Sequence, residues 1–201
     1  MEETLFSNRV KRPLADLLRP RKLEEVVGQE QVLGEDSPLG RMLFTGRISS
    51  FILWGPPGCG KTTIARLIAE HTNLYFEQIS AVFSGVADLK RVFQYAQDRR
   101  ATQGKGTLLF VDEIHRFNKS QQDGFLPYVE DGTIILVGAT TENPSFELNA
   151  ALLSRCQVFV LNRLNEDNFE ELLARAERET GRKLPVAVSY THLTLPTNSR
   201  V

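Results

Sequence analysis

The stretch that decides the fold is Gly-Pro-Pro-Gly-Cys-Gly-Lys-Thr, residues 55–62. It follows a short apolar run at 51–54 and precedes residues 61–72, whose apolar side chains recur at helical spacing. This is the pattern G-x-x-x-x-G-K-[ST] between a strand and a helix, where glycines let backbone N–H groups curl around phosphate oxygens. The N-terminus of the following helix adds a partial positive charge. The stretch predicts a phosphate-binding loop, and its flanks disfavour the alternative of a Gly/Pro turn with a solvated lysine.

The loop assigns chemistry to individual residues. Lys61 would reach the β- and γ-phosphates of a nucleotide, and the Thr62 hydroxyl would ligate Mg²⁺. The predicted nucleotide-binding residues of this region are Gly55, Pro56, Pro57, Gly58, Cys59, Gly60, Lys61, Thr62 and Thr63.

A second apolar run, residues 108–111, ends in Asp112 and Glu113. Ligands of open α/β sheets bind at the carboxyl ends of the strands, so Asp112 would hold Mg²⁺ through water. Glu113 would orient and deprotonate an attacking water. An acidic pair alone would indicate a solvated loop, and it is the phosphate loop that favours the catalytic interpretation.

A third polar group follows the apolar run 133–139, which ends in Thr140, Thr141 and Glu142. A hydroxyl there would lie beside the strand of Asp112 if the two strands are neighbours. The alternative is a loop of turn-forming residues.

Strand-like and helix-like segments alternate along the chain, which predicts βαβ units and a mostly parallel sheet covered on both faces. The expected strands are 51–54, 74–79, 107–111, 133–139 and 157–161. The expected helices are 38–44, 61–72, 86–103, 120–130, 146–154 and 166–180. Asn165 would cap the last helix and Gly181 would end it.

Composition narrows the class of protein. The 201 residues carry 24 Lys+Arg and 25 Asp+Glu, a net charge of −1, which excludes a strongly cationic nucleic-acid binder. Basic residues do gather in 1–22 and at Arg99-Arg100, as candidate phosphate contacts or as solvated faces. No apolar run approaches the ~20 residues of a membrane span, no export signal is visible, and the two cysteines are expected to be reduced. We therefore expect a cytoplasmic, nucleoid-associated protein without a membrane partner.

The motifs GPPGCGKTT, LLFVDEIH, VGATTEN and LSRC, in this order, resemble the AAA+ ATPases of the clamp-loader clade. RPRKLEEVVGQE, DEIHRFNKSQQDGFLPYVEDG and GATTENPSFELNAALLSRC narrow the resemblance to the replication-associated recombination protein A family, which includes the Werner helicase-interacting ATPases. The resemblance covers about residues 13–180. It implies a P-loop NTPase fold, a three-layer α/β sandwich with a parallel sheet, followed by the start of a helical lid.

The resemblance also implies residue roles. Thr141 falls at the sensor 1 position, which reports the γ-phosphate, and Arg155 falls at the arginine finger, which reaches the neighbouring subunit's site. Arg19, Pro20 and Val27 fall in the segment that packs against adenine. With Glu113 and Lys61, Thr141 and Arg155 complete the expected catalytic set.

The implied function is DNA-dependent hydrolysis of ATP with Mg²⁺, in replication-fork maintenance, recombination and repair. The implied partners are ATP, forked DNA or single-strand/double-strand junctions, and further copies of the chain, with replication proteins as additional candidates. The alternatives are a clamp-loader subunit, a Holliday-junction branch-migration motor, or a nucleotide-gated scaffold with slow turnover. The run Asp112–His115 also matches a DExH helicase, but 201 residues leave no room for two RecA-like lobes.

Three regions are expected: an ATPase core at 1–163, the first part of the lid at 164–187, and a tail at 188–201. The tail begins VSYTHLTLPT, which looks like the in-frame translation of a transposon-end sequencing adapter. We expect it to be a read-through segment, with a short strand and frayed terminus as the alternative.

Overall fold

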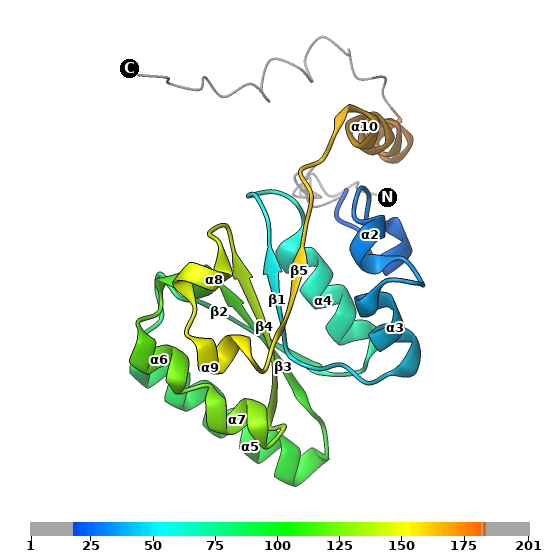
Figure 1. The fold of residues 1–201 in the computed structure, drawn as a ribbon. Coiled ribbons are helices and arrows are strands. Elements are labelled where there is room, and N and C mark those ends of the chain that lie inside the picture. Colours follow the sequence, from blue (N-terminus) through cyan, green and yellow to red (C-terminus); the bar gives the residue numbers. More distant parts are fainter. Residues whose placement is uncertain (1–17, 182, 184–201) are drawn as a thin grey trace, which may run out of the picture. The chain divides into compact units, whose positions relative to one another are not determined.

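The computed structural model describes residues 18–181 and 183. Its centre is a five-stranded sheet in the order β2-β3-β4-β1-β5, with every neighbouring pair parallel (Figure 1). The strands are β1 Phe51–Trp54, β2 Tyr75–Ser80, β3 Thr107–Asp112, β4 Ile134–Thr140 and β5 Gln157–Val160. The five expected strands and their parallel pairing are confirmed, with ends that differ by one residue at most.

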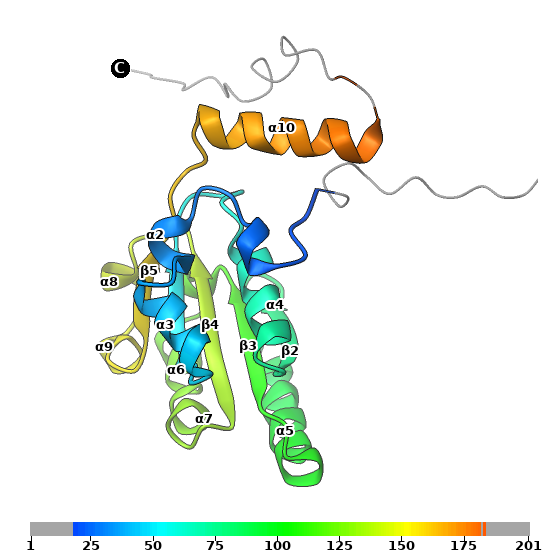
Figure 2. The ribbon, with the colours of Figure 1, turned by 90° about the vertical axis from the view of Figure 1, so that its right-hand side faces the viewer.

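Helices cover both faces of this sheet (Figure 2). Because side chains alternate along a strand, Phe51 and Leu53 face one core while Ile52 faces the other. The first core includes α3 (Pro38–Thr45) and α4 (Lys61–His71), with η1 (Leu23–Glu25) and α2 (Glu30–Leu33) beside them. The second includes α5 (Val86–Gln103), η2 (Ile114–Arg116) and α9 (Ala150–Leu153). The expected three-layer α/β fold is confirmed.

The prediction of a single helix is wrong for two segments, each of which forms two short helices. The segment 120–130 forms α6 (Lys119–Asp123) and α7 (Leu126–Glu130), because Pro127 has no N–H to bond the carbonyl of Asp123. The segment 146–154 forms α8 (Pro144–Glu147) and α9, because the Asn149 side chain accepts the Leu152 N–H at 2.7 Å and starts a new helix.

The last described helix, α10 (Glu166–Thr180), has the expected bounds. Asn165 caps it by accepting the Asn168 N–H at 2.9 Å, and Gly181 ends it with φ +65°. The chain divides into one compact unit at 20–164 and a second that contains α10 and residues 18–19. The expected tail at 188–201 lies outside the described residues, as does the basic segment before residue 18.

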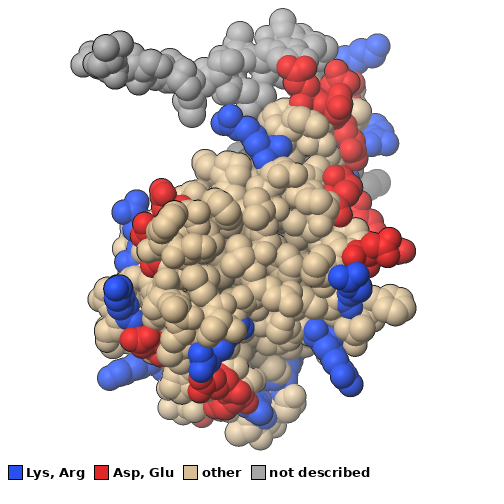
Figure 3. Space-filling view, viewed as in Figure 1, with Lys and Arg blue, Asp and Glu red and all other residues tan. Residues whose placement is uncertain are grey.

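Charge is dispersed over the face drawn in Figure 3, where basic and acidic side chains lie interspersed around the margin. None of the described helices is long and apolar enough to cross a membrane.

Candidate nucleotide-binding site

The carboxyl edge of the sheet brings the predicted site residues together. The phosphate loop leaves β1, whose neighbour β4 ends level with it: Trp54 pairs with Thr140, and the Gly55 N–H donates to the Thr140 carbonyl at 3.1 Å. On its other side β4 pairs with β3, so Asp112 also ends at this edge. The expectation that the threonine strand neighbours the Asp112 strand is confirmed.

Glycine is required at three positions of the loop. Gly58 and Gly60 have φ +78° and +98°, in the left-handed region that other residues rarely adopt. A Cβ on Gly55 would lie 2.6 Å from the Leu161 carbonyl oxygen. Because Gly60 caps α4 without a side chain, the first N–H groups of this 11-residue helix are left to an external acceptor.

Lys61 already lies within the loop, with 9% of its surface exposed. Its ammonium donates to the carbonyls of Gly55 at 2.7 Å and Pro56 at 2.9 Å. The neighbouring Cys59 is buried, and burial raises the pKa of its thiol although the Lys61 charge opposes the rise. The ammonium thus holds the loop in shape, and Cys59 is a neutral packing residue beside it.

Asp112 and Thr62 are the residues predicted to hold Mg²⁺. Both are half-buried, and both carry hard donors, a carboxylate and a hydroxyl, of the kind this ion prefers. In the described part of the chain, no three His, Cys, Asp or Glu residues form a metal-binding group. This donor set fits an ion that takes few protein ligands and shares the remaining ones with phosphates and water.

Glu113 follows Asp112 with φ +52°, an uncommon conformation for a residue other than glycine. Its Oε2 lies 3.3 Å from Nδ1 of His115, and the same nitrogen lies 3.0 Å from the Thr140 hydroxyl. The sequence does not predict this contact, because His115 stands out there only as part of the helicase-like DExH pattern. The spacing of two residues across a turn was the available signal. Thr141, the sensor candidate, directly follows Thr140 and is half-buried.

Arg155 lies at the opposite edge of the sheet. It lies two residues before Gln157, the first residue of β5, which pairs with Phe51, the first residue of β1. The length of β1, about 13 Å of strand, therefore separates this end of the sheet from the phosphate loop. The Nε of Arg155 donates to Glu130 Oε1 at 2.6 Å, its Nη2 contacts the same oxygen, and its Nη1 donates to the Ala151 carbonyl at 2.8 Å. The structure does not bring Arg155 to the site of its own chain.

The adenine candidates have different surroundings. Val27 is 8% exposed within the core, Pro20 is half-buried, and Arg19 is exposed and belongs to the unit that contains α10.

Gln29, two residues after Val27, is fully buried and connects this segment to the phosphate loop and to the end of β5. Its amide donates to the Asn162 carbonyl at 2.9 Å and more weakly to that of Cys59 at 3.4 Å, and it accepts the Asn162 N–H at 3.0 Å.

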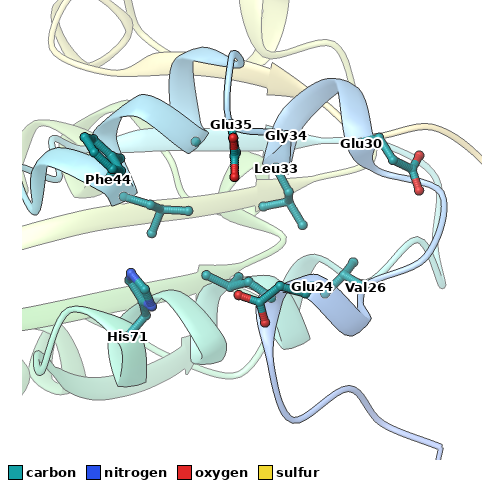
Figure 4. Close-up of a pocket in the computed structure, with 11 residues that line it drawn as sticks. Glu24, Val26, Glu30, Leu33, Gly34, Glu35, Phe44 and His71 are labelled. Carbon is teal, nitrogen blue, oxygen red and sulfur yellow. The ribbon is translucent and has the colours of Figure 1, made fainter.

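A separate hollow of about 630 Å³ lies between η1, α2, α3 and the far end of α4 (Figure 4). Its wall includes Phe44, His71 and the carboxylates of Glu24 and Glu35. His71 ends α4 ten residues after Lys61, about 15 Å along the helix, so the hollow is not the phosphate site.

Arg99 and Arg100, the basic pair on α5, both form contacts with other residues of the chain. Arg99 stacks over the Tyr75 ring at 3.4 Å and donates to the Thr107 hydroxyl at 2.8 Å. Arg100 donates to the Asp131 carbonyl at 2.8 Å. Arg99 therefore packs α5 against β2 and β3, and Arg100 joins α5 to the end of α7.

The loop, the acidic pair and the threonine strand at one edge of a parallel sheet define a P-loop ATPase. The model of the ATPase family associated with various cellular activities (AAA) matches residues 51–164, and the chain belongs to this family.

Relatives extend the similarity beyond the family model. The chain is 50% identical over 177 residues to replication-associated recombination protein A of Escherichia coli K12, covering 88% of the chain and 39% of the relative. It is 49% identical over 172 residues to ATPase WRNIP1 of Dictyostelium discoideum, covering 86% and 20%. Among solved structures, the RuvB Holliday junction branch migration motor of Thermotoga maritima is 30% identical, with a TM-score of 0.66 over 82% of this chain and 55% of that one.

These findings confirm the resemblance and the fold predicted from the sequence. The chain spans between 38% and 41% of the length of its curated bacterial relatives that carry the recombination protein name and are about half identical to it.

Proposed function

We propose that this chain is the ATP-hydrolysing core of a DNA-dependent AAA+ motor that acts at replication forks or junctions and works as an oligomer. The observation that carries the proposal is the meeting of the phosphate loop, Asp112, Glu113 and Thr141 at the carboxyl edge of the sheet, with Arg155 at the other edge. The names of the relatives, which refer to replication-associated recombination and to branch migration, support the choice of DNA as partner.

In this proposal the loop and the N-terminus of α4 bind the β- and γ-phosphates, and Lys61 exchanges its carbonyl partners for phosphate oxygens. Thr62, and Asp112 through water, would hold Mg²⁺, which would neutralise charge at the phosphates. Glu113 orients the attacking water and accepts its proton. Thr141 contacts the γ-phosphate, and Arg155 from a neighbouring chain stabilises the charge of the transition state.

Two variants separate binding from chemistry. Lys61→Ala should abolish ATP binding, whereas Glu113→Gln should bind ATP and fail to release phosphate. Lys90→Ala is the matched control, because Lys90 is an exposed lysine on α5. Fluorescent-nucleotide titration and phosphate release measure the two steps. Normal turnover in Glu113→Gln would refute the assignment of the base.

The proposal that Arg155 acts in the site of a neighbouring subunit is tested by mixing variants. The protein used carries this sequence and has the full length of the relatives. Arg155→Ala subunits keep an intact phosphate loop, and Lys61→Ala subunits keep an intact finger. If the finger acts between subunits, mixing the two inactive variants should restore part of the turnover. No recovery in oligomers shown to contain both variants would contradict the proposal.

DNA dependence is tested by adding forked, four-way and linear duplex DNA to the same protein. Stimulation by forks favours the fork-maintenance role, and stronger stimulation by four-way junctions favours a branch-migration motor, the second candidate indicated by the likeness to RuvB. A requirement for a sliding clamp would instead indicate a clamp-loader subunit. A single-turnover rate that no DNA accelerates would indicate a nucleotide-gated scaffold.

A further inference from the structure

We propose that His115 is the positioning residue that orients the Glu113 carboxylate and ties it to the end of β4. This inference rests on the proposed role of Glu113 as the base. It assigns a function to a side chain that is only 6% exposed and that lies between the acidic pair and the threonine strand.

The carboxylate needs such a partner. Glu113 is the first residue after β3 whose backbone leaves the strand, and its side chain is 32% exposed. A glutamate at a turn samples several rotamers, and a water activated for in-line attack requires one of them. Among the described residues, the polar side chain that the structure places against this carboxylate is His115, with Nδ1 at 3.3 Å.

The positioning role requires one tautomer of His115. A carboxylate only accepts hydrogen bonds, so the proposed positioning role requires the proton of the neutral ring to be on Nδ1 of His115. The Thr140 hydroxyl, 3.0 Å from the same nitrogen, can share that proton because its own hydrogen is directed to the Glu142 carbonyl at 3.1 Å. The Glu142 N–H donates back to this hydroxyl at 3.0 Å, which fixes the position of the oxygen. The ring is therefore held from β4, with its Nδ1 3.3 Å from the Glu113 carboxylate.

These bonds continue to the phosphate loop. The Thr140 carbonyl accepts the Gly55 N–H, and the Gly55 carbonyl accepts the Lys61 ammonium. Hydrogen bonds of Gly55 and Thr140 thus link Lys61 to His115, whose Nδ1 contacts the Glu113 carboxylate. Because Thr141 directly follows Thr140, the residue proposed to contact the γ-phosphate is covalently attached to one of these linked residues.

The test compares three substitutions at His115 in the full-length, DNA-stimulated protein. His115→Ala removes the donor and should lower kcat about 10- to 100-fold, as loss of an orienting partner typically does, while the Kd for ATP changes less than about threefold. His115→Asn places an amide nitrogen where Nδ1 was and should stay within about fivefold of the parent kcat. His115→Gln places its amide nearer the Nε2 position and should resemble His115→Ala.

A second variant keeps the proposal falsifiable if His115→Ala folds poorly. Thr140→Val preserves the side-chain shape and removes the hydroxyl that holds the ring, so kcat should fall about threefold to tenfold. Combined with His115→Asn, its effect should differ from the sum of the single effects, because both act on the same hydrogen-bond chain.

The outcomes separate this inference from the proposed function. If Glu113→Gln abolishes turnover but His115→Ala leaves kcat unchanged, the positioning role is wrong and the base stands. If His115→Asn and His115→Ala lose equal amounts of kcat and of melting temperature, His115 is only a packing residue. Normal turnover in Glu113→Gln would overturn both proposals together.

Discussion

Gln29 offers the sharpest test of how this fold holds its phosphate loop. Its side-chain amide is fully buried, and it pairs with both backbone groups of Asn162 as a strand would, at 2.9 and 3.0 Å. Replacing it by leucine keeps the approximate volume and removes both bonds. The N–H and C=O of Asn162 then lose their partner in a part-buried setting.

Each such group left unsatisfied costs about 1–3 kcal/mol, so we expect Gln29→Leu to lower the free energy of unfolding by about 3 kcal/mol. For a chain of this size each kcal/mol corresponds to about 2–4 °C, so the melting temperature should fall by about 6–12 °C.

The assay is urea unfolding followed by the fluorescence of Trp54, the chain's single tryptophan, which ends β1 directly before the phosphate loop. Gln97→Leu is the matched control, since Gln97 is an exposed glutamine on α5; we expect a change within about 0.5 kcal/mol. A Gln29→Leu protein within 1 kcal/mol of the parent would refute the reasoning that this amide holds the end of β5 to the loop.

Three further predictions concern the phosphate loop, the arginine finger and the half-buried thiol of Cys156. Gly60→Ala forces alanine to φ +98° at a cost of about 1–2 kcal/mol. In a nucleotide titration it should weaken ATP binding about tenfold, whereas Gly104→Ala, equally left-handed but at the far end of α5, should not. Arg155→Ala in the assembled protein should leave the Kd for ATP unchanged and lower turnover on the order of 10³-fold, a result contradicted by unchanged phosphate release. Burial raises the pKa of Cys156 to about 12, so this group stays a neutral thiol at pH 8. Mass spectrometry should find its alkylation slow in the native chain and fast in urea, and equal rates would show that the thiol is exposed.

Much of the fold could be predicted because its signals are local. Apolar runs bounded by turn residues predicted the strands, and the loop pattern at 55–62 predicted which strand end carries the phosphate site. The strands that end in Asp112 and Thr140 were expected to be neighbours, and β3 and β4 are neighbours in the sheet. The helix breaks at Pro127 and Asn149 were also encoded locally, but apolar periodicity across 120–130 and 146–154 masked them.

The contacts that complete the site could not be predicted in the same way, because they join residues far apart in the chain. Gln29 meets Asn162 across 133 positions, and His115 meets Thr140 across 25. Neither pairing has a periodicity or a motif, since each depends on which strands become neighbours. A buried polar side chain is identified as structural or functional only when its partners are known.

The position of Arg155 gives the strongest physical argument for assembly. Its own sheet holds it at the amino edge, while the phosphate loop, Asp112 and Glu113 lie at the carboxyl edge, and a strand is too rigid to bring the two together. The contact with Glu130 keeps the guanidinium extended on the surface in a defined orientation. Because both side chains are exposed, this pair adds little stability and can be exchanged for a phosphate without a large cost. A positive group that is fixed, exposed and directed away from its own site is suited to complete the site of another copy.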